Sequence, residues 1–214
     1  LMSFGPEHRT DDNVEMLLEA ANRMRTIIDS LLLFAKVGNA EAEIEPIDMG
    51  ALVKKARDGL KHEITERQAE ITIDGEDWPL VQGQPAWVEQ VWVNYMNNAL
   101  KYGGVPPRVV AGWTMDASGD PQFWVEDNGE GLAPAQRDMV FREFKRLDSA
   151  KSEEGHGLGL SIVRRIVERL GGEVGLDSEV GKGSRFYFTL KAAEPSLESV
   201  LRNQPPEQVT LQAH

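Results

Sequence analysis

An apolar repeat between residues 14 and 35 limits the possible folds more than any other feature of the chain. Its members are separated alternately by three and four positions, which is the heptad spacing of helices that pack side by side. They are Val14, Leu17, Ala21, Met24, Ile28, Leu31 and Ala35. Neighbouring apolar residues widen this seam into a broad face, which needs more than one partner helix, so the spacing predicts a bundle. A helix lying on the core of its own domain is the alternative. The regular spacing favours helix association between chains.

Charge and composition exclude several classes of partner. Lys and Arg number 23 against 35 Asp and Glu, a net charge of −12. Nucleic acid and anionic membrane surfaces reward clustered cations, so neither is expected as a partner. A small anionic ligand beside a local basic island stays open. The absence of Cys excludes disulfides and Cys-bound zinc.

No apolar run reaches the roughly 18 residues that a membrane span requires. We therefore expect a soluble segment with no membrane contact of its own. Its expected location is cytoplasmic. The chain begins with Leu1, which suggests a piece of a longer protein that could be anchored in a membrane elsewhere.

The pattern of the remaining chain predicts one mixed domain. We expect a helix over residues 1–37, a linker over 38–47, the domain over 48–191 and a loosely ordered tail over 192–214. Helical patterns cover residues 48–66, 85–102, 134–141 and 158–170, and strand patterns cover 70–74, 108–115, 122–126, 173–176 and 184–190. Because helices and strands do not alternate regularly, we expect an α+β fold with two layers, an antiparallel or mixed sheet and helices on one of its faces.

The first polar cluster lies near the end of the helix predicted over residues 85–102. Asn94, Asn98 and Lys101 are four and three positions apart, so they share one helix face. Carboxamide oxygens are hard neutral ligands that suit Mg²⁺, and a lysine supplies a point charge for phosphate. A solvated polar face is the alternative.

Two glycine-containing clusters follow. Residues 127–131, Asp-Asn-Gly-Glu-Gly, come directly after a strand pattern. Asp127 could accept a hydrogen bond from an amino group such as that of adenine, although an ordinary turn explains the same residues. Residues 155–160, Gly-His-Gly-Leu-Gly-Leu, lead into a helix, whose first N–H groups can bind phosphate.

The fourth cluster, residues 141–146, lies between these two glycine-containing segments. Phe141 and Phe144 are three positions apart and can pack one side of a loop, while Lys145 and Arg146 reach a phosphate tail. A short helix that buries both rings is compatible with this role. Residues 181–186 predict a tight turn that opens a last strand, with a structural role.

Together and in this order, the clusters resemble the N, G1, F and G2 boxes of the sensor histidine kinase catalytic domain, within the GHKL ATP-binding superfamily. The likeness covers about residues 46–191. The preceding helix resembles the second helix of the dimerisation and phosphoacceptor hairpin. The resemblance implies a Bergerat-type ATP-binding sandwich with a mobile lid, a homodimer formed through the N-terminal helix, and a response-regulator receiver domain as partner.

The resemblance also assigns roles residue by residue. In the N box it implies Asn94 and Asn98 as Mg²⁺ ligands, Lys101 as a phosphate contact and Tyr102 beside the nucleotide. In the G1 box it implies Asp127 as the reader of adenine, with Gly129 and Gly131 as turn glycines. The implied F-box residues are Phe141, Phe144 and Arg146, and the implied G2 residues, which close on the phosphates of ATP, are Gly155, Gly157, Leu158 and Gly159.

Position 94 helps to choose among the branches of the superfamily. Related ATPases have a glutamate there that activates water, whereas Asn94 cannot take a proton, which favours phosphoryl transfer to a protein side chain over hydrolysis. Two features depart from the family pattern. The family's acceptor motif is absent, since His8 has no acidic residue after it, and we expect the acceptor upstream of Leu1. Gln84 stands where the family often has aspartate. The alternatives are a non-catalytic module that signals by conformation and a serine-directed GHKL kinase.

Overall fold

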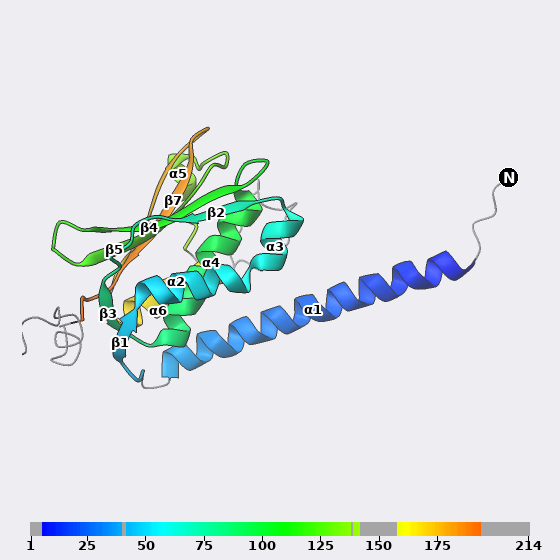
Figure 1. Ribbon diagram of the computed structural model, residues 1–214. Coiled ribbons are helices and arrows are strands. Elements are labelled where there is room, and N and C mark those ends of the chain that lie inside the picture. Colours follow the sequence, from blue (N-terminus) through cyan, green and yellow to red (C-terminus); the bar gives the residue numbers. More distant parts are fainter. Residues whose placement is uncertain (1–5, 40–41, 138, 142–157, 194–214) are drawn as a thin grey trace, which may run out of the picture.

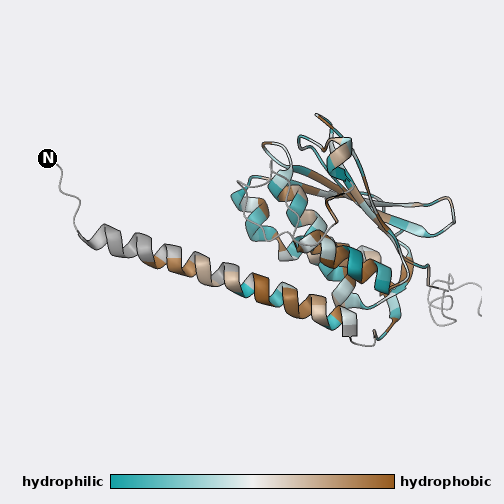
Figure 2. Ribbon diagram, turned by 180° about the vertical axis from the view of Figure 1, so that it is seen from behind, coloured by the Kyte–Doolittle hydropathy of each residue, from teal (hydrophilic) through white to brown (hydrophobic). Residues whose placement is uncertain are grey.

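The structure, a computed structural model, describes residues 6–39, 42–137, 139–141 and 158–193. Its longest element is α1 (Pro6–Asn39), which extends away from the rest of the molecule (Figure 1). The seam side chains stay exposed, with Leu17 at 70%, Met24 at 58% and Ile28 at 55%. The bands of apolar residues along α1 are visible in Figure 2. The helix α1 lies where the sequence pattern indicated one, and most of its seam does not lie on its own domain.

Only the C-terminal end of α1 packs on the domain. Val37 is 1% exposed, and the guanidinium of Arg165 lies 4.0 Å from the ring centroid of Phe34. Gly38 lies directly against this guanidinium, so that a Cβ there would require the end of the Arg165 side chain to shift. The long helix is therefore fixed to the domain through one short contact.

A five-stranded mixed sheet forms one layer of the domain. The strand order is β2-β4-β5-β7-β6, with β2 parallel to β4 and every other pair antiparallel. The strands are β2 (Glu70–Ile73), β4 (Arg108–Met115), β5 (Pro121–Asp127), β6 (Val174–Glu179) and β7 (Gly183–Thr189). The predicted mixed sheet is confirmed, including the β4–β5 hairpin around a polar turn.

Helices cover one face of this sheet, as Figure 1 shows, which confirms the two-layer α+β arrangement. They are α2 (Met49–Gly59), α3 (Lys61–Glu66), α4 (Pro85–Tyr102) and α6 (Gly159–Arg169). The short α5 (Pro134–Arg137) lies apart from them, at one end of the sheet (Figure 1). The helix predicted over residues 48–66 is divided at Leu60, and the one predicted over 134–141 contains only the four residues of α5. Gln84 caps α4, because its Oε1 accepts a hydrogen bond from the Trp87 N–H at 2.7 Å.

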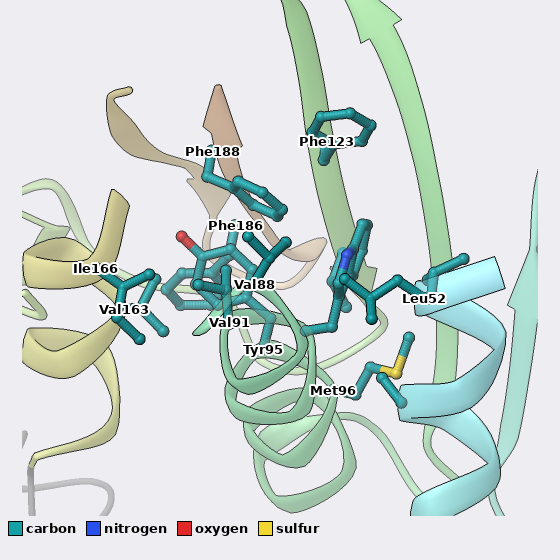
Figure 3. Close-up of a cluster of buried hydrophobic side chains, with 14 of the residues drawn as sticks. Leu52, Val88, Val91, Tyr95, Met96, Phe123, Val163, Ile166, Phe186 and Phe188 are labelled. Carbon is teal, nitrogen blue, oxygen red and sulfur yellow. The ribbon is translucent and has the colours of Figure 1, made fainter. Parts of the chain in front are cut away.

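The core lies between α4 and the sheet. Figure 3 shows α4 flanked by α2 and α6, with the aromatic rings of the strands above it. Phe123 and Phe188 are fully buried, and their ring centroids are 5.3 Å apart. Tyr95 is also fully buried and donates its hydroxyl proton to the carbonyl of Tyr187 at 3.1 Å. These contacts fix α4, which carries the first polar cluster, against the sheet.

The domain also contains a second, two-stranded sheet. The strands β1 (Glu45–Asp48) and β3 (Leu80–Gly83) pair antiparallel, and neither was predicted. Val81 also bridges to Ala192, and the Ala193 N–H donates to the carbonyl of Leu80 at 2.9 Å. Part of the predicted linker therefore forms a strand, and residues just beyond the predicted domain end join it.

The sheet face away from the helices carries a large ring over a glycine. The indole of Trp124 lies over Gly112 on the neighbouring strand, where a Cβ would overlap it. The guanidinium of Arg185 lies 4.2 Å from the centroid of Trp124 and is ion-paired with Glu126. Within the part of the chain that the structure describes, no helix is both long and apolar enough to cross a membrane.

Candidate nucleotide site

The C-terminal half of α4 presents the first predicted cluster on one face. Asn94, Asn98 and Lys101 are all half-buried, one turn after another. The Asn94 amide nitrogen donates to the carbonyl of Gln90 at 2.8 Å. With its nitrogen so engaged, the carboxamide oxygen of Asn94 points to Gly159, where a Cβ would be only 2.5 Å away. The structure thus brings the start of α6 against the asparagine face of α4.

The start of α6 belongs to the third predicted cluster. Leu158 is 4% exposed, and the helix begins at Gly159. Because the first N–H groups of a helix lack partners within it and carry the positive end of the helix dipole, this end can hold an anion. Gly155 and Gly157 lie outside the described residues. The described part of this cluster, at the start of α6, lies next to Asn94, as a shared phosphate and Mg²⁺ site would require.

Asp127 ends β5 and faces the helix layer. It is 7% exposed, and its Oδ1 accepts a hydrogen bond from the Gly129 N–H at 2.8 Å. Burial raises the pKa of this carboxyl from 3.8 to about 6; the backbone N–H groups of Gly129 and Ser184 oppose the shift, and the charge of Glu126 adds to it. A carboxylate that is costly to bury gains from a ligand that donates a hydrogen bond to it.

The glycine turn after Asp127 packs directly against the backbone of two other elements, α4 and β6. A Cβ at Gly129 would overlap the carbonyl of Tyr102 at the end of α4. Gly131 has φ +67, and a Cβ there would overlap the carbonyl of Glu179 at the end of β6. Only glycine fits both positions. The turn therefore brings together the ends of α4, β5 and β6, and Tyr102 is 38% exposed beside it.

Two residues of this region were given no binding role from the sequence. Ser184 lies opposite Asp127 in the β5–β7 ladder and is 8% exposed. Asn128 makes two hydrogen bonds to the loop between α4 and β4 and a third to Arg108, the first residue of β4. Both belong to segments that the sequence singled out as turns, but their partners are distant in the chain.

Of the three predicted F-box residues, Phe141 belongs to the part of the chain that the structure describes. The half-buried Phe141 packs edge-on against Phe186, with centroids 6.2 Å apart. Phe144 and Arg146 lie outside the described residues, so their role remains a prediction. Among the described residues no group of three or more His, Asp or Glu side chains forms a metal site. Neutral carboxamides beside a helix start fit a hard cation that keeps its waters and shares phosphate oxygens.

A fold of this kind, with a buried aspartate before a glycine turn and an asparagine face beside a helix start, defines an ATP-binding domain. A family model described as "Histidine kinase-, DNA gyrase B-, and HSP90-like ATPase" matches residues 83–194, more than half of the chain. The chain belongs to this family, and within it is the catalytic domain of a sensor histidine kinase.

Relatives and solved structures agree. The chain is 35% identical over 177 residues to Cyanobacterial phytochrome B from Nostoc sp., covering 82% of this chain and 23% of the relative. It is 30% identical over 194 residues to the adaptive-response sensory kinase SasA from Synechococcus sp., covering 87% and 52%. Full-length ShkA in complex with AMPPNP superposes with a TM-score of 0.73 at 27% identity, covering 91% of this chain and 42% of that chain. The chain thus spans about a quarter to a half of these curated relatives.

Proposed function

We propose that this chain is the kinase core that transfers the γ-phosphoryl group of MgATP to a histidine of a dimerisation hairpin, for relay to an aspartate of a response regulator. The observation that carries the proposal is the convergence of Asp127, the asparagine face of α4 and the start of α6. Each comes from a different part of the chain, and together they offer one acceptor for a base and donors for phosphates.

The proposed roles follow from the chemistry of each group. Asp127 accepts a hydrogen bond from the adenine amine, which offsets the cost of burying its charge. Asn94 and Asn98 would hold Mg²⁺, whose charge offsets that of the phosphate oxygens. Lys101 and the first N–H groups of α6 contact phosphate. The resemblance to the F and G2 boxes adds four residues to the proposed lid over the nucleotide: Phe144, Arg146, Gly155 and Gly157.

Asn94 supports transfer to protein over hydrolysis. An amide has no basic site that accepts a proton from water at neutral pH, and its nitrogen already donates to Gln90. No described acidic side chain takes its place on this face of α4. Catalysis by this chain then consists mainly of positioning and electrostatic stabilisation, as is usual for phosphoryl transfer.

The exposed seam of α1 supports association with a second copy. Val14, Leu17 and Ile28 are each more than half exposed, which a heptad face in water does not favour. We take α1 as the second helix of a dimerisation hairpin, with the acceptor histidine on a helix outside this chain. The catalytic domain itself then covers about residues 45–193, slightly more than predicted, because β1 and Ala193 both join β3.

Isothermal titration with a non-hydrolysable ATP analogue, with and without Mg²⁺, tests the nucleotide site. Binding that strengthens with Mg²⁺ is expected, and no binding under either condition would refute the proposal. Adding the hairpin of a related kinase together with labelled ATP tests the transfer. Acid-labile label on its histidine is expected; acid-stable label would favour a serine-directed kinase, and binding without any transfer would favour a module that signals by conformation.

A further inference from the structure

One side chain joins two separate pieces of the nucleotide site. The Asn128 Oδ1 accepts hydrogen bonds from the N–H groups of Gly104 at 2.9 Å and Arg108 at 2.8 Å. Its Nδ2 donates to the carbonyl of Pro106 at 3.2 Å. Gly104 and Pro106 belong to the loop between α4 and β4, and Arg108 is the first residue of β4. Asn128 itself follows Asp127 directly.

The rest of this loop is held to other elements. The Gly103 N–H donates to the carbonyl of Ala99 inside α4, and the carbonyl of Pro107 accepts from Glu70 in β2. The end of the loop nearest β4 is also held beside β5, because Val109 pairs with Asp127. The part of the loop nearer α4 is held to the turn after β5 by Asn128 and by close packing. That packing is tight, because a Cβ at Gly104 would be 2.7 Å from the Asn128 amide nitrogen.

We infer that Asn128 is a positioning residue, whose side chain fixes the distance between Asp127 and the end of α4. The inference rests on the proposed function, since Asp127 would read the base while Lys101 and Tyr102 contact other parts of the same nucleotide. Asn128 directly follows the first of these residues, and its loop directly follows the other two. Its hydrogen bonds therefore act together with the β4–β5 pairing and the packing of Gly129 against Tyr102 to set how far apart the two halves of the site lie.

The three hydrogen bonds of the Asn128 side chain, called the clamp below, contribute more to nucleotide affinity than to the stability of the fold. Asn128 is exposed, so water replaces its bonds when they break, and the loss to stability is modest. A ligand that contacts both halves at once is more sensitive, because displacements of about 1 Å weaken several contacts together. Removing the clamp should thus lower nucleotide affinity with little change in melting temperature.

A matched control exists at the opposite end of the same β4–β5 hairpin. The Asp116 Oδ1 accepts hydrogen bonds from the N–H groups of Ser118 at 2.8 Å and Asp120 at 2.9 Å. Asp116→Ala therefore removes the same kind of side-chain to backbone clamp, far from Asp127 along β5. Asn128→Asp is the conservative variant, because a carboxylate still accepts from both N–H groups but no longer donates to Pro106.

Titration of MgADP into the wild-type chain and the three variants tests the inference. Asn128→Ala should weaken binding about tenfold, which corresponds to ~1.4 kcal/mol. Asn128→Asp should recover most of that loss, and Asp116→Ala should bind as the wild type does. Amide hydrogen exchange gives a readout without nucleotide: Gly104 and Arg108 should lose protection in Asn128→Ala and keep it in Asn128→Asp.

The outcomes separate the two ideas. If the wild type does not bind MgADP, the proposed function fails, and the inference fails with it. If the wild type binds and Asn128→Ala binds equally well, the inference alone is overturned. Equal weakening by Asn128→Ala and Asp116→Ala would also overturn it, because the cause would then be general destabilisation. Failure of Asn128→Asp to recover affinity while the amides stay protected would do the same.

Discussion

Replacing Asp127 with asparagine should stabilise the free domain and weaken its nucleotide binding. The carboxyl is 7% exposed and its pKa is raised from 3.8 to about 6, so the folded state holds its proton more tightly than the unfolded state does. Stability from this group is therefore fully present below pH 3.8 and is lost as the pH rises through about 6. An asparagine carries no charge at any of these pH values.

The magnitude follows from the same pKa values. A shift from 3.8 to about 6 costs the wild-type domain roughly 3 kcal/mol of unfolding free energy above neutral pH. The introduced asparagine would keep an acceptor oxygen for the Gly129 N–H but lose the hydrogen bond from the Ser184 N–H. That loss lowers the unfolding free energy by about 1 kcal/mol or more. The net gain for Asp127→Asn is about 1–2 kcal/mol, or a few degrees of melting temperature.

Urea denaturation of both proteins across about pH 4 to 8 measures this difference. The variant's advantage in unfolding free energy should grow between pH 3.8 and about 6 and then stay constant. Affinity for an adenine nucleotide should fall about 10- to 100-fold at neutral pH, the loss of one hydrogen bond to a charged acceptor. A stability difference that does not change with pH would refute the reasoning. So would a wild type that gains on the variant as the pH rises.

Three further substitutions test other parts of the structure. Asn98→Ala should abolish the Mg²⁺-dependent part of nucleotide affinity and leave the melting temperature within about 1 °C, since a half-buried polar side chain adds little packing; titration with and without Mg²⁺ checks this, and unchanged Mg²⁺ dependence would contradict it. Gly112→Ala should lower the unfolding free energy by roughly 1–3 kcal/mol, because its Cβ overlaps Trp124; urea denaturation measures the loss, and a neutral result would show that the indole moves freely. Arg165→Ala should loosen the end of α1 by about 0.5–1 kcal/mol through loss of the contact with Phe34; amide exchange in residues 33–38 should become faster, and unchanged exchange would show that the contact contributes nothing.

The sequence predicted the elements whose signal is local and repeated. The heptad seam of α1 recurs over several turns, and the apolar run of β5 (residues 123–125) is continuous, so the structure of both could be predicted without a partner. The strands β1 and β3 contain four residues each, and one of them includes Pro46. A strand this short takes its stability from its partner, which lies more than 30 residues away in the chain.

The same difference between local signals and contacts with distant residues explains which parts of the candidate site could be predicted. The spacing of Asn94, Asn98 and Lys101 places them on one helix face by geometry alone. The clamp by Asn128 depends on where the loop after α4 returns to the sheet, and nothing near residue 128 in the sequence specifies that. Gln84 stood out only as a departure, and its role as the cap of α4 became evident from the bond to Trp87.

The second sheet also determines how the domain bears mechanical load. Residues 45 and 193 both attach to β3, and Lys191 pairs with Asp120 beside it, so tension applied through α1 and through the chain after residue 193 meets in this small sheet. Asp127 lies at the other end of β5, about 20 Å away by the rise of a seven-residue strand. A pull applied between α1 and residue 193 would therefore load the Arg165–Phe34 contact and the β1–β3 pairing before it reaches Asp127.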